Sequence, residues 1–359
     1  MDSKLLKKII KREEEGTYRS LSSFGDYIDF LSNDYLGASK FDFQSKASSF
    51  GSTGSRLISG SNKFTESCEK NISEFFGTQK ALVFNSGYDA NIGFFSAIPQ
   101  KGDTVIYDEH IHASIRDGVR LSYCESYSFR HNDIEDLKRK IKLSKGTIYV
   151  SIESLYSMDG DIPPIKEIAF LCKELDAYLV VDEAHAIGVF GELGKGLVDL
   201  LKVNEFVFAR LVTFGKAFGS HGAAILGSEN LINFLINFSR SFIYTTAMPM
   251  DSYRRISDVL TDDRLGFERQ KLKSNISHFC EVFKGFNSTS NPKSPVQLLK
   301  FGSISKAKDL AERIQEAKIA IKPIFSPTVQ KGNEGLRICI HSFNTFDEID
   351  FLYNQFMLD

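Results

Sequence analysis

Short apolar segments alternate with segments of helical period between residues 80 and 228. The apolar segments are rich in β-branched and aromatic residues and show little polar alternation, as in strands buried on both faces. Strands of this kind separated by helices predict a largely parallel sheet covered by helices, and so an α/β core. The expected strands span residues 81–84, 104–107, 147–152, 178–181, 206–214 and 223–226.

Helix signals appear within and after this core. Pro163 and Pro164 precede a segment with one apolar face, which predicts a helix that begins there. After Pro249 the pattern changes to longer, more polar helices with two weak strands, and Thr345 with Glu348 predicts a capping box at the start of a last helix. We therefore expect an N-terminal arm over 1–45, a large domain over 46–250 and a small α+β domain over 251–359.

Charge and cysteine content narrow the classes of partner. The 359 residues include 44 basic and 46 acidic side chains, which gives no support to a nucleic-acid or polybasic membrane partner. The five cysteines are scattered without CxxC spacing, so neither a disulfide framework nor a zinc site is expected, and the compartment is expected to be reducing and cytoplasmic. Residues 1–16 predict a short amphipathic helix, and no segment approaches the roughly 20 apolar residues that span a bilayer.

A lysine and an acid follow two of the predicted strands. Lys216 comes just after the strand over 206–214, among glycines that let a ligand approach the backbone, and Thr213 supplies a hydroxyl suited to a phosphate oxygen. Asp182 ends the strand over 178–181 and is followed by His185. This pairing predicts a pyridoxal 5'-phosphate (PLP) enzyme, in which the lysine forms a Schiff base with the aldehyde and the carboxylate keeps the pyridine nitrogen protonated.

Parts of this pattern also occur in two other kinds of site, an ATPase site and a metal site. The string Asp182-Glu183-Ala184-His185 also occurs in ATPases, but the glycine-rich stretches at 51–60 and 191–196 lack the Gly-Lys-Ser/Thr ending of a phosphate loop. His110 and His112 with His185 offer imidazoles to a metal, yet no spacing singles out a third ligand, so no metal is expected. We expect His112 to lie over a flat cofactor ring and His110 to be a solvated loop residue.

The turn Asn85-Ser86-Gly87-Tyr88 leads from a strand into a helix. Free N–H groups at a helix start favour an anion, so this turn is a candidate phosphate site.

Together these motifs resemble the α-oxoamine synthases, a family of fold-type I PLP enzymes, over nearly the whole chain. Further segments that carry the resemblance are 31–37 (LSNDYLG), 54–56 (GSR), Glu153 with 157–160 (SMDG), 244–246 (YTT) before Met248-Pro249, and 336–338 (LRI). The resemblance implies a mostly parallel seven-stranded sheet with helices on both faces and a smaller α+β C-terminal domain.

The resemblance also implies the cofactor residues. Lys216 would be the Schiff-base lysine, Asp182 the partner of the pyridine nitrogen, and His112 the residue that stacks on the ring. His185 and Ser157 would hydrogen-bond the ring hydroxyl, and these four (Lys216, His112, Asp182 and His185) would be catalytic. The phosphate would be held by Ser86, Gly87, Tyr88 and Thr213, and by Thr246 of the other subunit, which implies a homodimer with a shared active site.

The substrates implied are an amino acid and an acyl thioester, joined with loss of CO2 and thiol. Asn33 and Arg337 would grip the amino-acid carboxylate, Arg337 as a bidentate fork. The string over 32–37 and the compact length resemble the branch that condenses L-alanine with a pimeloyl thioester in biotin synthesis, where Arg19 or Arg12 would meet the distal carboxylate.

Other assignments stay open from the sequence. The rival branches use glycine with acetyl-CoA or serine with a long acyl-CoA; an aminotransferase and a non-catalytic partner subunit are further alternatives. The chain departs from many relatives at Thr65, where they carry histidine, and at Phe325, where the expected branch often carries arginine. The second departure bears on recognition of the acyl chain.

Overall fold

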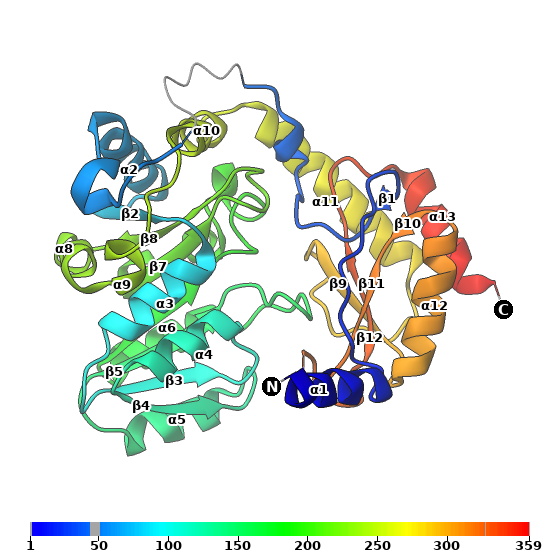
Figure 1. Cartoon of the computed structure of the whole chain (residues 1–359), viewed down its shortest axis with the longest axis horizontal. Coiled ribbons are helices and arrows are strands. Elements are labelled where there is room, and N and C mark those ends of the chain that lie inside the picture. Colours follow the sequence, from blue (N-terminus) through cyan, green and yellow to red (C-terminus); the bar gives the residue numbers. More distant parts are fainter. Residues whose placement is uncertain (1, 44–50, 327, 359) are drawn as a thin grey trace. The chain divides into compact units, whose positions relative to one another are not determined.

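The computed structural model describes residues 2–43, 51–326 and 328–358 and divides the chain into two compact units (Figure 1). The large unit comprises Asp34–Ser157 and Asp161–Lys271, and the small unit comprises Met1–Asn33, Met158–Gly160 and Leu272–Asp359. The division into an N-terminal arm, a large domain over 46–250 and a small domain over 251–359 stays a prediction.

The large unit is built on a seven-stranded sheet of order β2-β8-β7-β6-β5-β3-β4. Strand β8 is antiparallel to both of its neighbours, and the other strands run in one direction. The strands are β2 (Lys80–Phe84), β3 (Thr104–Asp108), β4 (Glu125–Phe129), β5 (Ile148–Glu153), β6 (Ala177–Asp182), β7 (Val207–Thr213) and β8 (Ala223–Gly227). The predicted largely parallel seven-stranded α/β sheet is confirmed.

Helices cover both faces of this sheet. Alternate residues of one strand belong to different clusters: Val180 of β6 packs in one, while Leu179 and Val181 pack in the other. Such alternation follows from the period of two along a strand. The helices are α2 (Lys63–Phe76), α3 (Gly87–Ala97), α4 (Ala113–Leu121), α5 (Ile134–Leu143), α6 (Ile165–Glu174), α7 (Leu197–Leu200), α8 (Glu229–Phe238), α9 (Arg240–Ile243), α10 (Met250–Leu260) and α11 (Arg264–Val282). Helix α6 begins directly after Pro163 and Pro164, as predicted.

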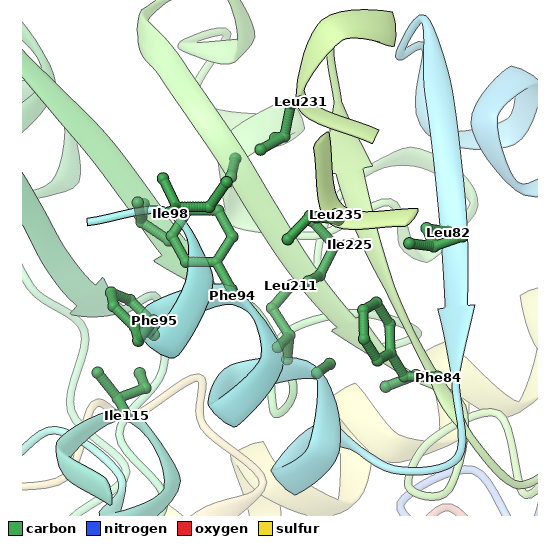
Figure 2. Packing of buried hydrophobic residues seen from close by; sticks show 14 of the residues in the cluster. Leu82, Phe84, Phe94, Phe95, Ile98, Ile115, Leu211, Ile225, Leu231 and Leu235 are labelled. Atoms are coloured by element: carbon green, nitrogen blue, oxygen red, sulfur yellow. The ribbon is translucent and has the colours of Figure 1, made fainter. Parts of the chain in front are cut away.

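The core beside α3 shows how one helix is fixed to the sheet (Figure 2). Phe94 and Phe95 are buried and pack in the cluster that holds Leu211 of β7 and Ile225 of β8. Burying side chains of this size contributes on the order of 2 kcal/mol each. The position of the first turn of α3 is therefore set by a large apolar contact deeper in the unit.

The small unit contains two small sheets and three helices besides its part of α11. Strand β1 (Ile28–Asp29) pairs with β10 (Ile319–Ala320), and an antiparallel sheet has the order β11-β12-β9. The remaining elements are β9 (Val296–Lys300), β11 (Lys322–Ile324), β12 (Gly335–Cys339), α1 (Asp2–Glu14), α12 (Ile304–Glu316) and α13 (Phe346–Met357). In the large unit, short 3-10 or π turns span Ala38–Lys40, Arg56–Gly60, Glu192–Gly194 and Asn204–Phe206.

Predictions for this part of the chain had mixed outcomes. The N-terminal helix is present as α1, and Thr345 and Glu348 form the predicted capping box of α13. The expectation of two strands after Pro249 was wrong, since the structure describes four there. Strands β10 and β11 are two and three residues long, too short to produce a period in the sequence.

Candidate active site

Five loops of the large unit meet at one edge of its sheet. Strands that run in one direction end at the same edge, and β2, β3, β5, β6 and β7 all do so. The loops that follow them carry the residues predicted to bind a cofactor. In chain order these are Ser86 and Gly87, His112, Ser157, Asp182 with His185, and Lys216.

Asp182 is buried at the end of β6, with a relative exposure of 6%. The side-chain amide of Asn91 donates to Oδ2 over 2.9 Å, and the backbone N–H of Ala184 donates to Oδ1 over 2.9 Å. Both carboxylate oxygens are therefore bonded, which fixes the orientation of the carboxylate. Asn91 lies on α3, and sequence reasoning missed it.

Lys216 follows β7 and is half-buried. Its positive charge lowers the pKa of both His112 and Glu153, so its ammonium group acts electrostatically on both side chains. The pKa of Glu153 is nevertheless raised well above its ordinary value, first by burial and then by the charge of Asp182. The backbone N–H of Ser157 donates to Glu153 Oε2 over 3.3 Å. This edge of the sheet thus combines Lys216 with two acids, Asp182 and Glu153, and burial raises the pKa of Glu153.

His112 begins α4 and connects to the aspartate through two side chains. Its Nδ1 lies 2.7 Å from the hydroxyl of Ser114, which accepts a hydrogen bond of 3.0 Å from the Asn91 amide. The side chain is exposed by surface area, yet enough protein surrounds the ring for desolvation to lower its pKa. Lys216 lowers this pKa further, while Asp182 acts in the opposite direction. A neutral imidazole is therefore favoured at this position.

His185 is buried and lies three residues after Asp182. The hydroxyl of Tyr35 is 2.7 Å from His185 Nδ1. This contact fixes the orientation of the imidazole ring. Tyr35 lies in the segment over 31–37 that supported the resemblance, but no role was predicted for it.

The turn at Ser86 and Gly87 lies against Thr213. A Cβ atom built on Gly87 would be 2.8 Å from Cγ2 of Thr213, so the two segments approach more closely than another residue allows. The Thr213 hydroxyl donates to the carbonyl of Ala184 over 3.2 Å. Helix α3 begins at Gly87 and presents its first N–H groups here, as an anion site requires.

The side chains of Ser86 and Tyr88 also bond within the chain. The Ser86 hydroxyl donates to Oδ2 of Asp89 over 2.8 Å and accepts from the Asp89 N–H over 3.1 Å. The Tyr88 side chain is exposed and donates to Asp117 over 2.8 Å. For Tyr88, as for Gly87, the backbone is the part suited to a phosphate.

Thr246 is exposed and lies in a segment held beside the same turn. The Asn85 amide donates to the carbonyl of Thr246 over 2.9 Å and to the Thr245 hydroxyl over 3.1 Å. These bonds leave the Thr246 side chain at the surface.

The predicted substrate residues lie in the small unit. Arg337 of β12 donates to Oδ1 of Asn33 over 2.9 Å and to Sγ of Cys339 over 3.0 Å. Two residues far apart in the sequence are thus brought together, with the guanidinium half-buried. Arg19 is exposed and lines a cavity together with Arg12.

His110 differs from its expected role as a solvated loop residue. It is half-buried and stacks on His131 with ring centroids 3.9 Å apart. His131 bridges two acids, at 2.8 Å from Asp108 and 2.7 Å from Asp161. Burial alone would lower the pKa of His131, but the hydrogen bonds to these acids outweigh it and raise the pKa to about 10. Sequence reasoning missed this cluster.

Across residues 2–43, 51–326 and 328–358, no group of three or more His, Cys, Asp or Glu side chains is arranged to hold a metal ion. In the same ranges no helix is long and apolar enough to cross a membrane.

The family follows from comparison with known proteins. The model of the aminotransferase class I and II family matches residues 25–349. The chain belongs to this family and, within it, to the α-oxoamine synthases. Its fold is that of the fold-type I PLP-dependent transferases, so the predictions of family and fold are confirmed.

Individual relatives are similar in sequence to this chain over most of their length. The chain is 36% identical to 8-amino-7-oxononanoate synthase of Emericella nidulans, over 95% of this chain and 92% of the relative. It is 38% identical to a putative 8-amino-7-oxononanoate synthase of Methanococcus vannielii, over 97% and 96%. It is also 35% identical to the aminoacyl transferase sphA of Aspergillus fumigatus, over 91% and 80%.

Solved structures give the same picture. A serine palmitoyltransferase from S. paucimobilis with bound PLP matches with a TM-score of 0.89 and 25% identity, over 98% of this chain and 95% of that one. An 8-amino-7-oxononanoate synthase from Francisella tularensis matches with a TM-score of 0.77 and 27% identity, over 92% and 96%. The chain is therefore similar to two branches of one family.

Proposed function

We propose that this chain is a PLP-dependent acyltransferase that condenses L-alanine with a pimeloyl thioester. The products are 8-amino-7-oxononanoate, CO2 and a free thiol, as in biotin biosynthesis. The observation that carries the proposal is the set of Lys216, Asp182 and His112 at one edge of the sheet. Within this set, Asp182 is linked to His112 through the side chains of Asn91 and Ser114. The relatives named 8-amino-7-oxononanoate synthase support the choice of branch.

PLP is the cofactor of this family, and the residues at the edge fit it. Asp182 is a buried carboxylate held in one orientation, as the partner of a pyridinium nitrogen must be. The close approach of Gly87 to Thr213 leaves backbone N–H groups at the start of α3 for a phosphate. His112 is the ring proposed to stack on the cofactor, and Nε2 of His185 with Ser157 is proposed to bond its hydroxyl.

When bound, PLP supplies an electron sink that stabilises negative charge at the amino-acid α-carbon. We assign the proton transfer at this carbon to Nζ of Lys216. The α-carbon then bonds to the thioester carbonyl carbon and the thiol leaves. The former amino-acid carboxylate departs as CO2, and a proton returns to the α-carbon.

Arg337 and Asn33 have the geometry to hold the amino-acid carboxylate before it departs. A guanidinium forms paired hydrogen bonds with a planar anion, and the 2.9 Å bond to Asn33 limits its rotation. Their proposed contribution is orientation of the substrate.

The site is proposed to be shared between two subunits of a homodimer. Thr246 carries an exposed hydroxyl on a segment fixed to Asn85, next to the phosphate turn. A second copy of the chain would receive this hydroxyl at its own phosphate, so each site would draw on both subunits.

A second candidate is the condensation of serine with a long acyl thioester. It is favoured by the serine palmitoyltransferase structures, with TM-scores of 0.89 and 0.91, and by the sphA relative. The departure at Phe325, where the biotin branch often has arginine, leaves room for a different acyl group. The lysine and aspartate chemistry would be the same.

The experiment that separates these candidates measures thiol release and CO2 from the PLP-loaded protein. L-alanine, glycine and L-serine are each combined with pimeloyl-CoA, acetyl-CoA, palmitoyl-CoA and a pimeloyl carrier protein, and products are identified by mass spectrometry. We expect product with L-alanine and a pimeloyl thioester. Release with another pair would reject the branch, and a keto acid without thiol release would indicate an aminotransferase.

A further inference from the structure

Two acids end neighbouring strands of the large unit. Glu153 of β5 is paired in register with Asp182 of β6. Four residues earlier on the same strands, Tyr149 and Tyr178 are also paired, and their rings stack with centroids 5.6 Å apart. Because side chains alternate with a period of two along a strand, Glu153 and Asp182 share this face, on strands about 4.8 Å apart. The two carboxyl groups are therefore neighbours.

Glu153 is buried, with a relative exposure of 3%, and has fewer hydrogen bonds than Asp182. The backbone N–H of Ser157 donates to its Oε2 over 3.3 Å, while its Oε1 has no hydrogen-bond partner among the described residues. Asp182 receives one bond of 2.9 Å on each oxygen. A second negative charge, on a buried carboxyl group with one bonded oxygen, is costly beside the first. The geometry therefore favours a Glu153 that carries a proton.

The charged groups that face Glu153 act in the same direction overall. Burial has the largest effect on its pKa and raises it, and the charge of Asp182 raises it further. Lys216 and two backbone N–H groups lower the pKa, yet it stays well above the ordinary value of 4.5. Tyr156 is also buried, which raises the pKa of its hydroxyl, so this neighbour adds no negative charge.

Glu153 also connects two loops that carry residues proposed to hold PLP. Ser157, whose N–H donates to its carboxyl group, lies in the loop after β5. The backbone N–H of His112, just before α4, acts on the same carboxyl group as a donor. The carboxyl oxygens are thus placed to align the hydroxyl proposed to bond the cofactor and the imidazole proposed to cover its ring.

We propose that Glu153 is a positioning residue of the PLP site and that it works as a neutral carboxylic acid. Its oxygens accept from the loops that carry Ser157 and His112, and its proton leaves the negative charge at this edge of the sheet on Asp182. The proposal rests on the function above and adds a residue that has no role there. Glu153 keeps its proton throughout the reaction, so no chemical step passes through it.

The protonation state is tested by infrared difference spectra of the PLP-loaded protein at neutral pH. The wild type is compared with Glu153→Gln, which keeps the shape of the side chain and removes the carboxyl group. We expect the variant to lose the carbonyl band of one neutral carboxylic acid. Glu174→Gln, which replaces an exposed glutamate of α6, should lose a carboxylate band instead.

The positioning role is tested by the visible absorption of bound PLP and its titration with pH. Glutamine is neutral and keeps an oxygen acceptor, so Glu153→Gln should retain the wild-type titration and a kcat/KM within about threefold. Glu153→Met has a similar length without a carbonyl acceptor. We expect its affinity for PLP to fall about tenfold and its titration to shift, because two backbone donors lose their partner.

Other results would overturn the proposal. Loss of a carboxylate band in Glu153→Gln would show that Glu153 is charged, and a shifted PLP titration in this variant would show that its charge acts on the cofactor. Wild-type PLP affinity and titration in Glu153→Met would remove the positioning role. The expected spectra in a protein that turns over no thioester would keep the role of Glu153 and reject the proposed reaction.

Discussion

The side-chain amide of Asn91 on α3 donates a hydrogen bond of 2.9 Å to Asp182 at the end of β6. The same amide reaches the Ser114 hydroxyl over 3.0 Å, which lies 2.7 Å from Nδ1 of His112. One asparagine therefore positions both the carboxylate proposed to hold the pyridine nitrogen and the imidazole proposed to cover the ring. It acts through these groups as a positioning residue.

Replacing Asn91 with alanine should weaken the hold on Asp182. Loss of a hydrogen bond to a buried charged group costs about 1.5–3 kcal/mol, so we expect kcat/KM to fall at least about tenfold. The visible absorption spectrum of bound PLP and its pH titration should shift, because Asp182 would stabilise the ring proton less well. Asn237→Ala, an exposed asparagine on α8, is the control. An unchanged PLP spectrum with normal kcat/KM would contradict the positioning role.

Lys216→Ala should abolish turnover while the protein keeps its fold. We expect product formation to drop at least about a thousandfold, because the group proposed to move the α-proton is gone. Borohydride reduction followed by mass spectrometry should no longer attach PLP to the chain. Lys166→Ala, an exposed lysine of α6, should behave as the wild type does. Retained acyl transfer in Lys216→Ala would reject the assignment.

Gly87→Ala should impair cofactor binding. The added Cβ would lie 2.8 Å from Cγ2 of Thr213, so the turn must move away from the strand. Overpacking of this kind costs about 1–3 kcal/mol, and we expect the affinity for PLP to fall roughly tenfold. Gly266→Ala in α11, whose Cβ would lie 3.9 Å from Nη2 of Arg269, should leave PLP affinity unchanged. Wild-type PLP affinity in Gly87→Ala would argue against the phosphate site.

His131→Gln should destabilise the large unit in a pH-dependent way. Removing a cation held between the buried Asp108 and the half-buried Asp161 costs about 3 kcal/mol. The pKa of His131 is raised to about 10, so its contribution is complete below its ordinary pKa of 6.5 and is lost as the pH rises through 10. Urea unfolding at several pH values should show the wild type and variant converging toward pH 10. The control is His278→Gln, which breaks a pair with the half-exposed Asp350 and should lower the free energy of unfolding by less. A difference in stability between the wild type and His131→Gln that stays constant with pH would contradict the assignment.

A shared active site predicts complementation between two inactive variants. Thr246→Glu places a negative charge where the partner's phosphate is proposed to lie, and Lys216→Ala removes the lysine. When the two are refolded together in equal amounts, half of the dimers contain one intact site, so about a quarter of wild-type activity should return. Activity no higher than that of the separate variants would mean that the site lies within one subunit.

The sequence was sufficient to predict the strands of the large sheet that are buried on both faces. β5 and β6 lie close to the predicted segments because their apolar runs are continuous. β4 was missed because its sequence, ESYSF, is polar and four of its five residues are exposed at the edge of the sheet. An edge strand has a partner on one side alone and needs no apolar run.

The site was predictable in part for a similar reason. Lys216 and Asp182 each follow a strand, and parallel strands bring their ends together. Asn91 and Tyr35 were missed because their roles depend on the rotation of a helix and the path of a loop, which no local pattern encodes. His131 was missed because its partners, Asp108 and Asp161, are distant in sequence and meet only in the folded unit.

The strand order has a consequence for how the protein is made. Strand β2 lies at one edge of the sheet and pairs with β8 alone, Lys80 opposite Gly227. During synthesis, β2 therefore leaves the ribosome long before its only partner exists. Until β8 emerges, the apolar residues 81–84 cannot pair in the sheet. A nascent chain stalled before that point therefore exposes an unpaired apolar strand, which favours aggregation. The first strand of this sheet to be made therefore waits for the last one, β8, before it can pair.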